Sequence, residues 1–65
     1  MTKISASAAQ LRLAQAVREA CERELLQAYE QASISGLCHE GAWECAVGAV
    51  RELDLEALLR QLPED

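Results

Sequence analysis

Residues 8–33 contain neither glycine nor proline, and in a chain of 65 residues such a stretch leaves room for little besides one long helix. It is rich in Ala, Leu, Gln, Glu and Arg, which all favour the helix interior. Ser7 and Gln10 have the spacing of a capping box, in which each side chain accepts a hydrogen bond from the other residue's backbone N–H. We therefore expect a helix over residues 8–33, about 39 Å long at ~1.5 Å per residue.

The apolar residues of this helix recur at every fourth position and form a ridge along one side. Charged and polar side chains occupy the far side, as in a helix that buries one face against a neighbour. The ridge comprises Leu13, Val17, Cys21, Leu25 and Tyr29. We expect these side chains to contribute to a core or an interface.

A turn is expected after this helix, where Ser33 and Ser35 precede Gly36. Gly36 suits the left-handed position that follows a helix C-terminus, and Leu37 is the apolar residue that often comes next. So short a connection favours an antiparallel neighbour. We therefore predict a helical hairpin whose second helix spans residues 39–53.

A third, shorter helix is predicted from the phase of the apolar residues on either side of Asp54. At about 100° per residue, the apolar residues of 42–53 and those of 55–62 centre on faces roughly 160° apart. A straight helix would expose one of these groups, whereas a break at Asp54 allows both to turn inward. We expect the third helix over residues 55–62, ended by Pro63.

Apolar side chains cover about 200° of the second predicted helix, whereas a helix with one neighbour needs a stripe only somewhat wider than ~100°. The second helix should therefore have two neighbours: the first helix, and either the third helix or a second chain. Its candidate core and interface residues are Ala42, Trp43, Ala46, Ala49, Val50 and Leu53. We expect an all-α homodimeric bundle, and the alternative is a monomeric cluster of three helices.

The composition strengthens the case for a second chain. The chain has no Phe, one Trp, one Tyr and one Met, so its 51% hydrophobic content depends on alanine. A chain of this size buries only about 60% of the surface that its unfolded form exposes, and small proteins usually add disulfides, a metal or a partner. We expect one helical domain over residues 1–65, with flexible ends at 1–6 and 63–65.

The net charge and the cysteines indicate which classes of partner and which cellular compartment the chain suits. The net charge is −5, with only six Lys and Arg side chains, which disfavours binding to nucleic acid or to an anionic membrane. The three cysteines are an odd number, and the N-terminus lacks the apolar core of a signal peptide. These features favour free thiols in the cytoplasm, and no sequence motif predicts a cofactor.

Cys38 and His39, at the start of the second predicted helix, are the densest group of reactive side chains. A helix N-terminus and a neighbouring histidine both favour the thiolate form, so Cys38 is the candidate reactive thiol. The alternative is a small, half-buried cysteine at a turn. We expect no metal site, because Cys38 and Cys45 lie about 10.5 Å apart along the helix and zinc–sulfur bonds are ~2.3 Å long.

These observations favour a small acidic module that acts without catalysis, through protein–protein interaction or regulation. Its expected partner is itself, as a homodimer, and possibly another protein. Two alternatives remain: a thiol-based redox sensor or thiol-dependent enzyme centred on Cys38 and His39, and an accessory subunit of a larger enzyme. The chain has one histidine and no second strong general base close to it, so it does not fit an ordinary hydrolase.

Overall fold

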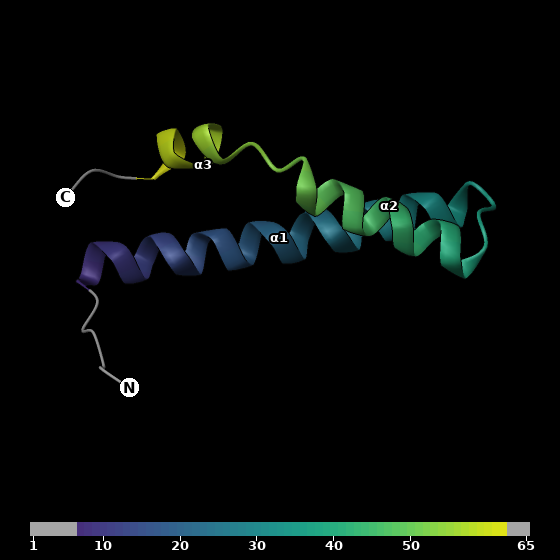
Figure 1. The fold of residues 1–65 in the computed structure, drawn as a ribbon, viewed down its shortest axis with the longest axis horizontal. Helices are drawn as coiled ribbons and strands as arrows, with labels where there is room; N and C mark the ends of the chain where they lie inside the picture. Colours follow the sequence, from purple (N-terminus) through teal and green to yellow (C-terminus); the bar gives the residue numbers. More distant parts are fainter. Residues whose placement is uncertain (1–6, 63–65) are drawn as a thin grey trace.

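Three α-helices and no strand make up residues 7–62, the part of the chain that the computed structural model describes. They are α1 (Ala8–Ile34), α2 (His39–Arg51) and α3 (Leu55–Gln61). α1 and α2 run antiparallel, side by side, and α3 returns beside the N-terminal half of α1 (Figure 1). The predicted all-helical hairpin with a short third helix is confirmed, with helix ends within two residues of those expected. The ends expected to be flexible, 1–6 and 63–65, lie outside the described residues.

α1 begins with the predicted capping box. The Gln10 N–H donates to Ser7 Oγ at 3.1 Å, and the Ser7 N–H donates to Gln10 Oε1 at 2.9 Å. The first N–H groups of a helix have no partner within the helix, and the two side chains supply partners at this end. Ser7 and Gln10 therefore determine locally where α1 starts.

α1 ends in a Schellman motif at Gly36. The φ of Gly36 is 96°, in the left-handed region that glycine enters without steric cost. The Leu37 N–H donates to the carbonyl of Ala32 at 3.0 Å, and the Gly36 N–H donates to that of Ser33 at 3.1 Å. The chain thus reverses direction between α1 and α2 at the expected place.

The core between the helices is made of alanine. The buried residues of the described chain are Ala20, Ala32, Ala42 and Ala46, which we call the alanine seam. Alanine extends a single methyl group, so helices that meet through it bury little apolar area. The larger residues of the predicted ridge, from Leu13 to Tyr29, are only half-buried. Within residues 7–62, no large side chain is enclosed at the centre of the fold.

α3 is a separate helix, as the phase of its leucines predicted. α2 ends at Arg51, and Asp54 Oδ1 accepts a hydrogen bond of 3.0 Å from the Ala57 N–H at the start of α3. The expectation that the break turns all the leucines inward is wrong for Leu55 and Leu59, which are 55% and 54% exposed. The reason is that α3 packs against α1 alone, and one neighbour covers only one side of a helix.

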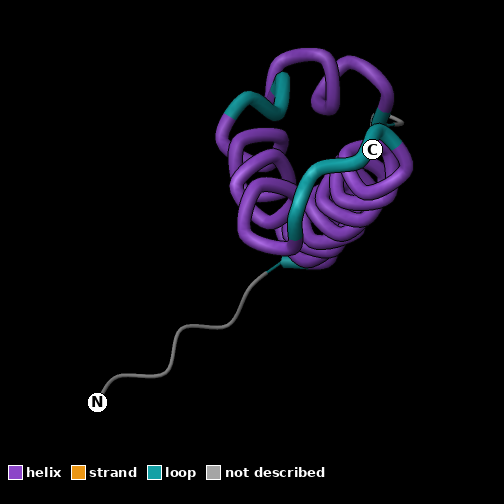
Figure 2. The backbone as a smooth tube through the Cα atoms, turned by 90° about the vertical axis from the view of Figure 1, so that its right-hand side faces the viewer, coloured by secondary structure: helices purple, strands orange, loops and turns teal. Residues whose placement is uncertain are grey.

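This arrangement leaves α2 with one neighbour among the described helices. α2 packs against α1, and no part of α3 packs against α2. Seen along the long axis in Figure 2, α3 lies over one side of the α1–α2 pair, and no described helix covers the opposite side. Of the two second neighbours predicted for α2, the third helix is therefore excluded. A second chain stays a prediction.

Candidate functional site

The outer side of α2 carries the largest side chain of the protein in an exposed position. Trp43 is 50% exposed and lies between two shallow hollows. One hollow is lined by Trp43, Glu44, Val47 and Arg51, and the other by His39, Glu40, Trp43 and Glu44. We call these six residues the Trp43 surface.

The Trp43 surface faces away from α3. Glu52 lines the cleft beside α3 and follows Trp43 by nine residues, which places it about 180° round the helix from Trp43. Cys45, roughly 200° from Trp43, lies beside Ala28 and Ala32 of α1. Trp43 therefore lies on the side of α2 that faces away from the cleft beside α3.

Trp43 was expected in the core or in a dimer interface. A place in the core of the single chain is wrong, because half of the side chain meets solvent. A tryptophan presents about 200 Å² of surface, so a partner that covers the exposed half removes roughly 100 Å² from water. At about 25 cal/mol per Å², this burial contributes about 2.5 kcal/mol. The interface thus remains the predicted place for Trp43.

His39, at one edge of the Trp43 surface, is bound to α1. Tyr29 Oη lies 2.6 Å from His39 Nδ1, and the two rings meet edge to face with their centroids 5.7 Å apart. This contact joins the first turn of α2 to the C-terminal part of α1. It gives the N-terminal end of the Trp43 surface a defined position.

The structure gives Cys38 and His39 different partners. Cys38 is exposed, and its Sγ accepts a hydrogen bond of 3.5 Å from the Gly41 N–H, which makes it the N-cap of α2. His39 directs Nδ1 to Tyr29 instead. Capping is therefore a sufficient structural role for Cys38, and a reactive thiol at this position stays a prediction.

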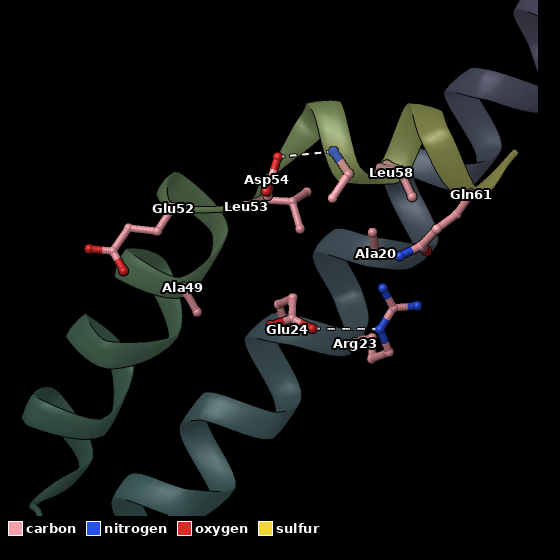
Figure 3. Close-up of a pocket in the computed structure, with 10 residues that line it drawn as sticks. Ala20, Arg23, Glu24, Ala49, Glu52, Leu53, Asp54, Leu58 and Gln61 are labelled. Atoms are coloured by element: carbon pink, nitrogen blue, oxygen red, sulfur yellow. Dashed lines mark hydrogen bonds and ion pairs between the residues drawn. The ribbon is translucent and has the colours of Figure 1, made fainter.

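A cleft of about 440 Å³ is lined by residues of α1, of α3 and of the C-terminal end of α2 with the turn that follows it (Figure 3). Its apolar lining includes Ala20, Ala49 and Leu58. Glu24 lies at this cleft and pairs with Arg23 of the same helix at 3.6 Å. Its charged lining residues are Arg23, Glu24, Glu52 and Asp54, and no cysteine, histidine or serine is among the lining residues. We interpret it as a gap left where the short α3 crosses the hairpin.

The other candidate core residues are covered to different degrees. Ala42 and Ala46 are buried, and the half-buried residues are Leu13, Val17, Cys21, Leu25, Tyr29, Ala49, Val50 and Leu53. The sequence-based list of site residues did not include Glu44, Val47 and Arg51, which surround Trp43. Their spacing of one, four and eight residues from Trp43 was the available signal, because it places them within about 100° of Trp43 on a helix.

Neither metal ligands nor known relatives point to another site. Among residues 7–62, no three His, Cys, Asp or Glu side chains gather where they could hold a metal ion. None of the helices in this range has both the length and the apolar content that a membrane span requires. No protein-family model, curated protein or solved structure matches the chain. The Trp43 surface is therefore the feature from which a function can be inferred.

Proposed function

We propose that this chain is a protein-interaction module and that its partner docks on the Trp43 surface. The observation that carries the proposal is a half-exposed Trp43 on a helix with one neighbour. Tryptophan is enriched among the residues that dominate binding energy, and such residues usually lie at the centre of an interface within a ring of weaker contacts. Trp43 and Val47 would form the centre of this interface, and Glu44 and Arg51 beside them would belong to the surrounding ring.

The make-up of the core supports a partner. The alanine seam buries only methyl groups, and no larger side chain is fully buried in the described residues. Large apolar side chains that are at least 44% exposed are Leu11, Leu26, Ile34, Leu37, Trp43, Leu55 and Leu59. Burial of apolar surface is the dominant favourable term in folding and in association. A partner that covers part of this surface therefore stabilises the fold as well as the complex.

The charges of the chain favour a protein partner over a nucleic acid or a membrane. The net charge is −5, whereas binding to phosphate groups depends on clustered Lys and Arg. The Trp43 surface carries both signs, with Glu40 in the first turn of α2 and Arg51 in its last turn. Mixed charges of this kind suit another polypeptide surface. The free cysteines suit a reducing, cytoplasmic setting for the module.

Site-specific photo-crosslinking in the native host tests the proposal. A photoreactive amino acid replaces Val47 in the full chain, and a matched control replaces Glu30, which is exposed and lies about 200° round α1 from the buried Ala32. We expect position 47 to form a covalent adduct with a protein chain and position 30 to form far less. Equal yields at the two positions would overturn the Trp43 surface as the docking site. The mass of the adduct shows whether the partner is a second copy or a different protein.

A further inference from the structure

We infer that the partner on the Trp43 surface is a second copy of this chain, with the two α2 helices packed antiparallel about a two-fold axis at Val47. The inference rests on the proposed function and adds the identity and the register of the partner. Two properties of the Trp43 surface support the inference. Its charges and its shape each fit the same surface of a second copy that is turned by the two-fold axis.

The charged edge of the Trp43 surface changes sign along α2. Glu40 and Glu44 lie in the first half of the helix and Arg51 in its last turn, and all three are exposed. In an antiparallel pair about Val47, Glu44 of each copy lies close to the level of the partner's Arg51, because the two residues are three and four positions from the axis. The ion pair forms twice, as a two-fold axis requires. A parallel pair would instead bring the acidic ends of the two helices together.

The shape of the Trp43 surface also fits its own copy. Trp43 lies between two hollows, and Val47 and Arg51 line one of them. In the antiparallel register, the partner's Trp43 lies at the level of Arg51 and so enters this hollow. Its indole covers Val47, on the edge of the helix pair opposite to the ion pair between Glu44 and Arg51. Each copy thus supplies both the ring and the hollow that receives it.

Light scattering after size-exclusion chromatography of the full chain tests the identity of the partner. We expect twice the chain mass of 7.1 kDa at high micromolar concentration. Trp43 is the only tryptophan, so its quenching by acrylamide should fall as the dimer forms. Trp43→Ala should raise the dissociation constant of the dimer at least about tenfold, because it removes the central ring. Circular dichroism of this variant should still show the helices.

Charge reversal tests the antiparallel register. Glu44→Arg or Arg51→Glu alone should raise the dissociation constant about tenfold, because each change replaces two attractions with two repulsions. Both changes in one chain restore the two pairs with their signs exchanged, so the constant should return to within about threefold of the original value. Glu30→Arg, on the far side of α1, is the control and should leave the constant unchanged.

The possible failures are distinguishable. A mass of 7.1 kDa at every concentration would overturn pairing with a second copy. If position 47 then crosslinks to a different protein, the proposal of an interaction module is still supported. If no adduct forms at all, both proposals are overturned. A dimer that the combined Glu44→Arg and Arg51→Glu changes do not restore would overturn the antiparallel register.

Discussion

The phenol oxygen of Tyr29 lies 2.6 Å from Nδ1 of His39, and this bond joins the C-terminal part of α1 to the first turn of α2. The methyl groups of the alanine seam give contact without direction, whereas a hydrogen bond requires a defined geometry. The bond between Tyr29 and His39 therefore helps to fix the rotation of α2 about its own axis. That rotation decides where Trp43 points.

A double-mutant cycle measures this bond. Tyr29→Phe removes the hydroxyl and keeps the ring, and His39→Ala removes the imidazole partner of that hydroxyl. We expect a coupling free energy of about 0.5–1 kcal/mol between the two changes, in the range of a partly solvated hydrogen bond. Urea unfolding at one fixed protein concentration is the measurement, since association alters apparent stability. Fully additive effects would show that the bond contributes nothing.

Two glycines should respond in opposite ways to alanine. Gly36 has a φ of 96°, and an L-residue in this left-handed conformation costs about 1–2 kcal/mol, so Gly36→Ala should destabilise the fold. Gly48 is helical, and a methyl group there would meet no atom within 4 Å, so Gly48→Ala should stabilise the fold by about 0.5–1 kcal/mol. Thermal unfolding of both variants checks the signs.

Enlarging the alanine seam should separate the helices. Ala46 is 0% exposed, and Ala46→Leu places three more carbon atoms where α2 meets α1. We expect a loss of about 1–3 kcal/mol in the free energy of unfolding, the usual result of overpacking. Ala9→Leu, at an exposed position in the first turn of α1, is the control and should change this value by less than about 0.5 kcal/mol. Similar effects at both positions would contradict a closely packed seam.

Cysteine labelling separates exposure from reactivity. Cys38 and Cys45 are exposed and Cys21 is half-buried, so alkylation at neutral pH should modify the first two faster than Cys21. Mass spectrometry of digests taken over time gives the three rates. Exposure alone predicts similar rates for Cys38 and Cys45, whereas the thiol hypothesis predicts a large excess at Cys38. Similar rates at these two positions would remove a redox or catalytic role for Cys38.

The helix ends were predictable because their signals act over three or four residues. Ser7 binds Gln10, Gly36 closes the last turn of α1, and Asp54 binds the N–H of Ala57. Each of these contacts depends on residue types at a fixed short spacing. Tertiary packing does not have to be known for such contacts to be read from the sequence.

The packing of the helices was less predictable, because it depends on how the axes cross and rotate. The leucine pattern of 55–62 required a break at Asp54, but it did not show that α3 rests on α1 alone and leaves Leu55 and Leu59 exposed. The bond between Tyr29 and His39 joins two helices across ten residues of sequence, so no local sequence pattern predicted it. The width of the apolar face on α2 predicted a second neighbour without identifying it.

The alanine seam has a mechanical consequence. Alanine has no side-chain rotamers, so its burial costs no side-chain entropy and offers no alternative packing. The contact between α1 and α2 therefore has no alternative side-chain packing within the seam. When a partner binds the Trp43 surface, the side-chain entropy that is lost comes from exposed residues such as Glu44 and Arg51, and none comes from the seam.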